Sequence, residues 1–364
     1  MKKTKKRIAV LTGGGDCPGL NAVIRAVAKK AILTQDMEII GIEDGYLGLI
    51  ENRCRALSYQ DVSGILTLGG TILGTSNTAN PYRHAVREGK EPVFRDVSAA
   101  AIGNLKKLGV VCLVCIGGDG TLAIAHRLQE DGVNVVGVPK TIDNDLRGTD
   151  VTFGFDSAVT VATEGIDRIH TTAQSHHRVM IVEVMGRTAG WLALHSGLAG
   201  GGDVILIPEI PYDIEVVAER VRERAQKGKR FSIIVVSEGA KPKGGEMVVE
   251  RVVTDSHDPI RLGGVGAKLA RDIEDACGLT TRYTILGHLQ RGGTPTAFDR
   301  TLATRFGHHA MELVAAGRTG RMVCLKGQDI TSVPIARAVA TLKTVPPNHP
   351  LIKTARAVGT SFGV

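Results

Sequence analysis

The sequence predicts an α/β protein of two similar three-layer lobes, each with a mostly parallel sheet, and an active site in the cleft between them. Length is the first observation, because 364 residues can form two cores of ordinary size. The second is an alternation of apolar, strand-like runs with helix-like segments, which is typical of parallel α/β sheets. The third is that glycine-rich turns follow several of these runs, where such sheets bind ligands.

The composition favours a globular protein that acts on small anionic molecules. Hydrophobic residues make up 43% of the chain and charged residues 23%, and the net charge is +8. The positive charge is dispersed apart from a basic terminus over residues 2–7, and no basic stripe with interleaved aromatics is present. We therefore expect anionic small substrates, with neither nucleic acid nor a membrane as partner.

The cysteines indicate a reducing compartment. Six of them are scattered without the spacing of a disulfide framework. Cys112 and Cys115 form a C-x-x-C, but they lie within an apolar strand-like run, where we expect core thiols on opposite faces and not a zinc site. Lysine and arginine dominate the first seven residues and the following apolar run stops at Thr12, so we expect no signal peptide and a cytoplasmic protein.

The first strand, over 7–12, is followed by a glycine-rich turn over 13–21 and an alanine-rich helix over 22–33. Such a unit binds phosphate, because glycines let backbone N–H groups approach an anion and the helix N-terminus adds partial positive charge. The turn is neither a G-x-G-x-x-G dinucleotide fingerprint nor a Walker A loop, which argues against a dehydrogenase. A glycine turn without a ligand is the alternative for this stretch taken alone.

The rest of the first lobe repeats this pattern. We expect, in order, a strand over 37–42, a loop over 44–49 whose Tyr46 could stack on a base, a polar surface segment over 77–96, a helix over 97–108, a buried strand over 110–116 and a helix to about 130. The turn over 117–121, between the last strand and helix, is again glycine-rich and contains Asp119.

A third strand-to-turn junction carries two carboxylates. The mostly apolar run 133–138 leads into Pro139-Lys140-Thr141-Ile142-Asp143-Asn144-Asp145. Two nearby aspartates are favoured only where a cation, a hydrogen-bond donor or a substrate hydroxyl uses them. If the strands are parallel, this turn meets the two glycine turns at one edge of the sheet. We interpret it as the floor of an active site.

The second lobe alternates in the same way. We expect helices over 158–172, 188–199, 214–227, 262–276 and 297–316, strands over 178–184, 203–208, 231–236 and 282–286, and a mostly irregular tail. Polar residues stand at presumed strand ends, namely Arg178, Arg187, Glu238, Arg282, His288 and Arg291. Because guanidinium groups grip phosphate as a planar fork, these arginines predict an anionic substrate.

A phosphate and Mg²⁺ site on one lobe that faces a basic pocket on the other is the geometry of phosphoryl transfer. We assign residues 1–154 plus about 290–340 to the nucleotide and Mg²⁺ lobe. Residues 155–289 plus about 341–364 are assigned to the lobe that binds the acceptor substrate.

Six motifs resemble those of the 6-phosphofructokinase family, in order and at the family's spacing. They are GGDCPGLN over 14–21, GYLGL over 45–49, GGDGT over 117–121, PKTIDND over 139–145, MGR over 185–187 and GHLQRGG over 287–293. The resemblance covers nearly the whole chain, and six ordered motifs make chance similarity negligible. It implies phosphorylation of the 1-hydroxyl of D-fructose 6-phosphate by Mg-ATP, the committing step of glycolysis, in a homodimer or homotetramer.

The resemblance also implies a role for each matching residue. Asp143 would be the general base that takes the hydroxyl proton, and Asp119 would bind Mg²⁺, with Asp145 reaching the ion through water. The nucleotide would be bound by Gly15, Tyr46, Asn77, Gly118, Asp119, Gly120, Thr121 and Lys140. Fructose 6-phosphate would be bound by Thr141, Ile142, Asp143, Met185, Gly186, Arg187, Glu238, His288 and Arg291, with Arg178 and Arg282 reaching across from a neighbouring subunit.

Two positions bear on the phosphoryl donor, and they disagree. Gly120 resembles the ATP users of the family, because an aspartate there, as in pyrophosphate enzymes, would occupy the α-phosphate space. Lys140 resembles the pyrophosphate users, since bacterial ATP enzymes have glycine at that position. We give Gly120 more weight, because a missing side chain makes room for the nucleotide. Asn77 stands where bacterial ATP enzymes have an arginine, and Lys140 would supply the missing charge.

Two other functions are weighed against this one. A pyrophosphate-dependent, reversible phosphofructokinase is the nearest alternative, and a non-catalytic phosphosugar-binding regulator on the same fold is a remote one. Effector control is expected to be weak or altered. Arg25, Lys227 and Lys229 fall near the effector positions of bacterial enzymes, but Tyr59 and His170 stand where that site has arginines.

Overall fold

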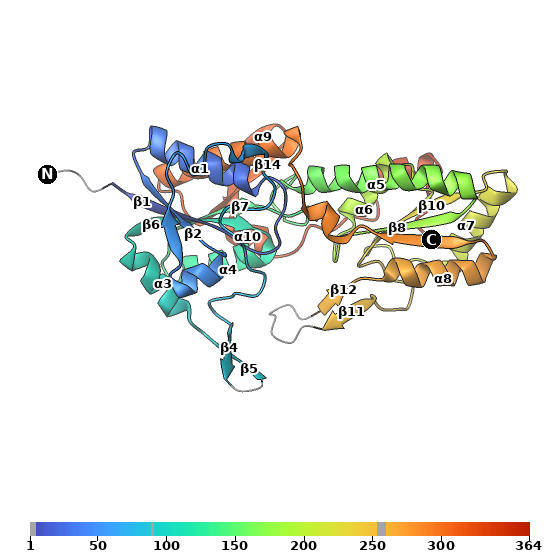
Figure 1. The fold of residues 1–364 in the computed structure, drawn as a ribbon, viewed down its shortest axis with the longest axis horizontal. Coiled ribbons are helices and arrows are strands. Elements are labelled where there is room, and N and C mark those ends of the chain that lie inside the picture. Colours follow the sequence, from blue (N-terminus) through green and yellow to red (C-terminus); the bar gives the residue numbers. More distant parts are fainter. Residues whose placement is uncertain (1–4, 89–90, 253–259) are drawn as a thin grey trace.

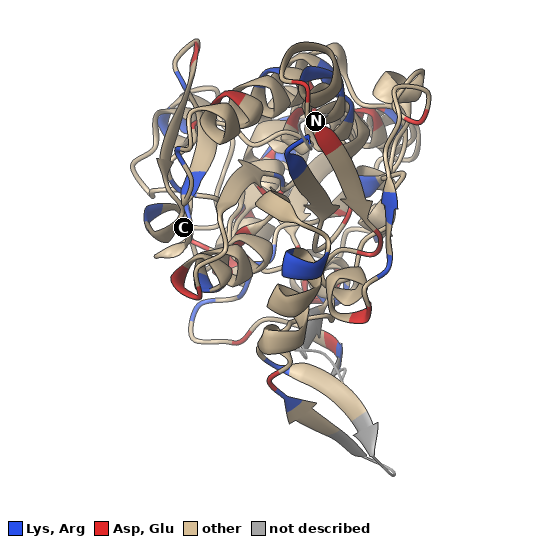
Figure 2. Cartoon of the chain, turned by 90° about the vertical axis from the view of Figure 1, so that its left-hand side faces the viewer, with Lys and Arg blue, Asp and Glu red and all other residues tan. Residues whose placement is uncertain are grey.

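Two sheets organise the chain, one in each lobe, and each is covered by helices on both faces (Figure 1). The computed structural model describes residues 5–88, 91–252 and 260–364. Residues 2–4 of the basic terminus lie outside the described residues. Basic and acidic residues are interspersed over the side of the molecule that Figure 2 shows, in agreement with the dispersed charge of the sequence. The predicted α/β class with two mostly parallel sheets is confirmed.

The first sheet has seven strands in the order β15-β14-β7-β6-β1-β2-β3. The five inner strands run parallel to one another, while β15 and β3 are antiparallel edges. The bounds are β1 Arg7–Thr12, β2 Glu38–Ile42, β3 Cys54–Ala56, β6 Val110–Gly117, β7 Val135–Pro139, β14 Arg321–Lys326 and β15 Asp329–Pro334. Because the inner strands are parallel, the turns that follow β1, β6 and β7 lie at one edge of the sheet.

Helices pack on both faces of the first sheet, because the middle residues of its inner strands are apolar and present side chains alternately to the two sides. They are α1 Leu20–Thr34 and α9 Ala297–Ala315 on one face, and α2 Tyr46–Glu51, α3 Ser98–Lys107, α4 Asp119–Glu130 and α10 Ile335–Val339 on the other. Cys112 and Cys115 of β6 belong to these two opposite cores, as their spacing predicts. All six cysteines are unpaired.

The second sheet has four parallel strands in the order β13-β8-β10-β9. Their bounds are β8 Val179–Val184, β9 Val204–Leu206, β10 Ser232–Ser237 and β13 Thr281–Ile285. The covering helices are α5 Phe155–His176 and α6 Trp191–Ala199 on one face, and α7 Ile214–Gln226 and α8 Val265–Cys277 on the other. The buried side chains of the sheet face that packs on α5 and α6 form one continuous core with those of the first lobe.

Smaller elements complete the fold. They are the 3-10 helices η1 Ile65–Thr67 and η2 Gly287–Arg291, the hairpins β4 His84–Glu88 with β5 Glu91–Arg95 and β11 Val249–Val252 with β12 Ile260–Leu262, and helix α11 Pro350–Ala357. Both hairpins project from the same side of the molecule (Figure 1). After α10 the chain returns to the second lobe, where Ser361 bridges to Val204 of β9. Among the described residues, no helix is both long and apolar enough to span a membrane.

Two predictions about local structure are wrong. Residues 44–49 are not a loop, because Tyr46 begins the short helix α2. The tail is not mostly irregular, because β14 and β15 form an antiparallel hairpin that joins β7 of the first sheet. The reason is tertiary: β14 pairs in parallel with a strand that lies far back in the chain. The division into 1–154 plus about 290–340 and 155–289 plus about 341–364 stays a prediction.

Candidate active site

The carboxyl ends of β1, β6, β7, β8 and β10 border a cleft of about 580 Å³ between the two lobes. Most of the predicted site residues line it. These are Gly15, Tyr46, Asn77, Gly118, Asp119, Gly120, Thr121, Lys140, Thr141, Asp143, Met185, Arg187, Glu238, His288 and Arg291. Parallel strands bring their carboxyl ends together, and two such sheets that face each other enclose a cleft with phosphate turns on one wall and arginines on the other.

The turn over 140–145, which we term the carboxylate turn, follows directly from the end of β7. Thr141 Oγ1 accepts a hydrogen bond from the N–H of Asp143 at 3.0 Å. Asn144 has a left-handed backbone with φ of 51°, a conformation that asparagine adopts more readily than most residues. One carboxylate oxygen each of Asp143 and Asp145 is buried without any hydrogen-bond partner. A buried oxygen of this kind is costly unless a bound group satisfies it, so both point to a ligand.

Burial and neighbouring negative charge alter the acidity of this turn. Burial raises the pKa of Asp143 to about 6, although the positive charge of Arg291 opposes the shift. Burial also raises the pKa of Asp145, and the nearby carboxylates of Asp143 and Asp119 raise it further. Three carboxylates that repel one another, two of which have a buried oxygen, favour a cation between them.

The donor set fits Mg²⁺ that arrives with phosphates. Among residues 5–88, 91–252 and 260–364, no cluster of three or more His, Cys, Asp or Glu side chains forms a ready-made metal cage. Magnesium in phosphoryl-transfer enzymes is usually held by one or two carboxylates, with phosphate oxygens and water as the other ligands. Asp119 and Asp145 are two carboxylates that could hold Mg²⁺ in this way, because both line the cleft and Asp145 has an oxygen without a hydrogen-bond partner.

The phosphate wall of the cleft is built from close backbone approaches. Gly15 lies against the guanidinium of Arg291, and a Cβ at this position would come within 2.2 Å of its Nη1 atom. Arg291 Nη1 in turn donates to the carbonyl of Asp16 at 3.2 Å. Lys140 is buried, and its ammonium donates to the carbonyl of Gly15. Two cations therefore hold the first glycine turn beside the carboxylate turn.

Gly120 leaves the nucleotide side of the cleft open. It is the second residue of α4, and a Cβ added there would meet no atom within 4 Å. The neighbouring Thr121 is buried, and its carbonyl accepts a hydrogen bond from the hydroxyl of Tyr46 at 2.8 Å. Tyr46 is thus a buried part of the cleft wall, held in place by the hydrogen bond of its hydroxyl, and the residue is only 3% exposed.

The acceptor side is assembled from the ends of β8 and β10. The N–H of Gly186 donates to Glu238 at 3.4 Å, and the N–H of Met185 donates to Gln290 at 3.3 Å. Burial raises the pKa of Glu238 to about 7. Gln290 is fully buried within η2, so it ties the segment that carries His288 and Arg291 to the end of β8.

The comparison with known proteins decides the family. The family model described as phosphofructokinase matches residues 7–314. The chain belongs to the phosphofructokinase family. It is 54% identical to the ATP-dependent 6-phosphofructokinase 2 of Clostridium perfringens over 364 residues, which is 100% of each chain. It is also 54% identical to the pyrophosphate–fructose 6-phosphate 1-phosphotransferase of Amycolatopsis methanolica, over 94% of this chain and 97% of the other.

The fold of the family is found in solved structures too. The T-state phosphofructokinase of Pichia pastoris superposes with a TM-score of 0.79 at 34% identity. The match covers 93% of this chain and 36% of the yeast chain, so this protein corresponds to about a third of that longer polypeptide.

Four predicted residues of this phosphofructokinase do not line the cleft. Ile142 is 1% exposed in the core, and Gly186, which follows Met185 in the chain, is buried. Arg178 immediately precedes β8 and Arg282 is the second residue of β13, so both lie at the amino ends of parallel strands. With a rise of about 3.3 Å per residue, Arg178 is roughly 20 Å from Met185 along the strand. These two arginines are therefore not at the strand ends that face the cleft of this chain.

Several residues that line the cleft of this phosphofructokinase are not among those predicted from the sequence. They are Gly14, Asp16, Ser76, Ala79, Ile124, Glu250, Arg251 and Leu262. The first two lie within a motif that was already identified, and adjacency to Gly15 was a usable signal. Glu250, Arg251 and Leu262 belong to the β11–β12 hairpin. Nothing in the local sequence of that hairpin indicates that it reaches the site.

Proposed function

We propose that this protein transfers the γ-phosphoryl group of Mg-ATP to the 1-hydroxyl of D-fructose 6-phosphate, giving fructose 1,6-bisphosphate and ADP. One observation carries the proposal. The carboxylate of Asp143 has a buried oxygen without a hydrogen-bond partner and lies in a cleft between an open phosphate turn and a basic pocket. A protein that only binds a sugar phosphate does not need such a base beside the hydroxyl of the sugar.

The geometry suggests how the reaction proceeds. Asp143 takes the proton from the 1-hydroxyl of the sugar while the hydroxyl oxygen forms a bond to the γ-phosphorus. The bond between the γ-phosphorus and the β-phosphate oxygen breaks, and ADP leaves. Because Asp143 has a raised pKa, its carboxylate is a stronger base than an exposed aspartate. Bound Mg²⁺ supplies charge neutralisation to the phosphates, and Asp119 and Asp145 are the residues that would hold it. Arg187, His288 and Arg291 bind and orient the sugar phosphate.

Gly120 favours ATP as the donor. Overall similarity does not separate the donors, because relatives named for ATP and for pyrophosphate are both 54% identical to this chain. The open space beside Gly120 favours ATP over pyrophosphate, because a nucleotide needs room there for its α-phosphate. A Cβ added at Gly120 would meet no atom within 4 Å. Two further relatives, 52% and 48% identical to this chain, are also named ATP-dependent 6-phosphofructokinases.

A pyrophosphate-dependent, reversible reaction is the second candidate. Lys140 is the observation that favours it, because its buried ammonium lies at the phosphate turn and could hold a pyrophosphate without help from a nucleotide.

We also propose that the active enzyme is a homodimer or homotetramer in the cytoplasm. Arg178 and Arg282 lie on the far edge of their own sheet, and Arg282 is about half exposed, so a neighbouring subunit's cleft is the site that they could reach. The unpaired cysteines fit a reducing compartment.

The test is the turnover of fructose 6-phosphate by the purified protein with Mg²⁺, with ATP and pyrophosphate offered separately. Activity with ATP alone is expected. Activity with pyrophosphate alone would mean that Lys140 outweighs Gly120, and activity with neither would favour a phosphosugar-binding protein. In the matched Asp143→Asn variant, kcat should fall by about 10²–10⁴-fold while the sugar phosphate still binds.

A further inference from the structure

Lys343 is tied to the carboxylate turn although it comes from near the end of the chain. It lies between α10 and α11, in the segment that returns to the second lobe. Its backbone N–H donates to the carbonyl of Asp145 at 2.7 Å, and its own carbonyl accepts a hydrogen bond from Trp191 Nε1 at 2.7 Å. Trp191 begins α6, so Lys343 connects the turn that carries the reacting carboxylates to the second lobe.

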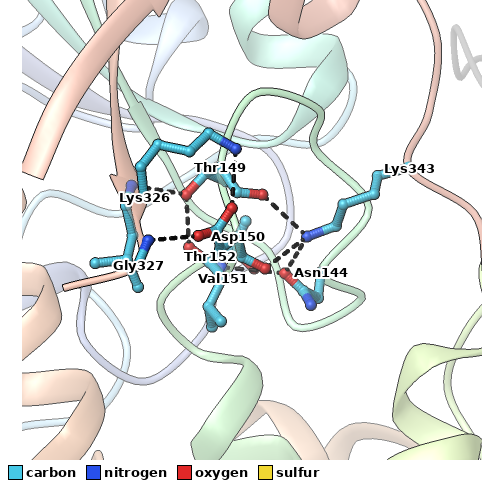
Figure 3. Close-up of polar contacts among 9 residues, drawn as sticks. Asn144, Thr149, Asp150, Val151, Thr152, Lys326, Gly327 and Lys343 are labelled. Carbon is cyan, nitrogen blue, oxygen red and sulfur yellow. Dashed lines mark hydrogen bonds and ion pairs between the residues drawn. The ribbon is translucent and has the colours of Figure 1, made fainter. Parts of the chain in front are cut away.

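The ammonium group of Lys343 binds three acceptors behind the turn (Figure 3). It donates to Asn144 Oδ1 at 2.8 Å, to the carbonyl of Asp150 at 3.0 Å and to the carbonyl of Thr149 at 3.2 Å. An ammonium has three N–H donors, and each of them has a partner here. Lys343 is not among the described residues that line the cleft, so its ammonium group binds the carboxylate turn and not a substrate.

Asn144 is the residue through which this support acts. It stands between Asp143 and Asp145, is 4% exposed, and has the left-handed backbone described above. Its Oδ1 accepts one further hydrogen bond, from the N–H of Thr152 at 3.1 Å. The hydroxyl of Thr152 donates to the carbonyl of Thr141 at 2.7 Å, which secures the start of the same turn. Loss of the ammonium would leave Asn144 Oδ1 with a single donor and remove a partner from two carbonyls.

We propose that Lys343 is a positioning residue for phosphoryl transfer, which acts through Asn144 to hold Asp143 and Asp145 in the directions that proton abstraction and metal binding need. The inference rests on the proposed function. Because the substrates do not touch Lys343, its loss lowers kcat while the KM values change little. A displacement of a reacting group by about 1 Å costs about 10²-fold in rate.

Lys326 provides a matched control in the same network (Figure 3). Its ammonium donates to the carboxylate of Asp150 at 2.8 Å, on the loop that Lys343 binds through the carbonyl of the same residue. The N–H of Gly327 donates to the other carboxylate oxygen at 2.8 Å. Lys326 is about half exposed and has no bond to Asn144, so its removal deletes a cation from the loop without releasing the turn.

The experiment compares Lys343→Met, Lys326→Met and Asn144→Gly in the full-length enzyme. Glycine keeps the left-handed backbone of residue 144 while it deletes the acceptor. We expect kcat to fall about 100-fold in Lys343→Met, with KM values for both substrates within about threefold of wild type. Lys326→Met should keep the wild-type kcat. The double variant Lys343→Met/Asn144→Gly should lose no more than the worse single variant, because both substitutions delete the same interaction.

Several results would overturn the positioning role. They are a wild-type kcat in Lys343→Met, an equal loss in Lys326→Met, or losses that multiply in the double variant. If Lys343→Met does not fold by its melting curve, Lys343→Arg keeps the charge, and its planar fork cannot reach all three acceptors, so kcat should still fall at least tenfold. A wild-type kcat in Lys343→Arg would also overturn the inference. A wild-type enzyme without phosphotransferase activity would refute the proposed function instead, so the two failures are distinct.

Discussion

Replacing Gly120 by aspartate tests the reasoning about the phosphoryl donor. The structure predicts that the variant folds, because a Cβ at this position meets no atom within 4 Å and the backbone there is helical. A carboxylate in the first turn of α4 is also favourable to the helix N-terminus, by about 0.3–1 kcal/mol. Any loss of activity in Gly120→Asp therefore reports on the cleft and not on stability.

The magnitude follows from the charge. An aspartate at residue 120 would lie in the nucleotide side of the cleft, and we take its contact with a bound α-phosphate to mean a separation of about 4 Å. At an effective dielectric constant of about 20, two like charges at that distance repel by about 4 kcal/mol. That energy corresponds to an increase of about 10³-fold in the KM for ATP. Pyrophosphate has no α-phosphate at that place, so its use should not decrease in the variant.

Gly120→Ala is the matched control for this prediction. Alanine adds the Cβ without the charge, so the KM for ATP should change less than about threefold, and the helix should gain about 0.5–1 kcal/mol in stability. The assay is steady-state turnover of fructose 6-phosphate with ATP and with pyrophosphate, together with melting curves. A KM for ATP within tenfold of wild type in Gly120→Asp, or an equal loss in Gly120→Ala, would refute the electrostatic reasoning.

Three further predictions concern the carboxylate turn. With both substrates limiting, kcat/KM should fall about tenfold per pH unit below about pH 6, because only ionised Asp143 accepts a proton and burial raises its pKa to about 6. A limb that lies near pH 4, where an exposed aspartate titrates, would contradict that shift. Asp145→Asn should stabilise the ligand-free protein by about 1–3 kcal/mol at pH 8 and by less at pH 5. The reason is that burial raises the folded-state pKa of Asp145 to about 7, so its destabilising charge is lost as pH falls; urea titrations at both pH values measure this, and equal effects would argue against it. Lys140→Gly should lower kcat about 100-fold, because the ammonium of Lys140 would no longer contact the transferred phosphoryl group. Adding Asn77→Arg to this variant should restore part of the loss. Turnover close to wild type in Lys140→Gly would disprove the idea that Lys140 supplies the charge that is missing at Asn77.

Much of the candidate site could be predicted from the sequence, because its reactive residues lie in short motifs at the ends of predicted strands. A strand that ends on a glycine turn, or on two carboxylates, shows both the residue types and the edge of the sheet where they meet. Parallel order then brings residues 15, 119 and 143 together without any further information. The same logic predicted the α/β class, since buried strands of a parallel sheet are apolar on both faces.

The tertiary structure alone decided which distant segments support those patterns. Lys343 binds Asn144 across 199 positions of sequence, and no periodicity or motif indicates such a partner. The tail hairpin of β14 and β15 and the cleft residues of β11 and β12 were missed for the same reason. Arg178 and Arg282 begin the strands predicted over 178–184 and 282–286, but only the parallel sheet shows that this end lies away from the cleft. Local patterns determine which groups can react, whereas their orientation depends on contacts between segments that meet only after the chain has folded.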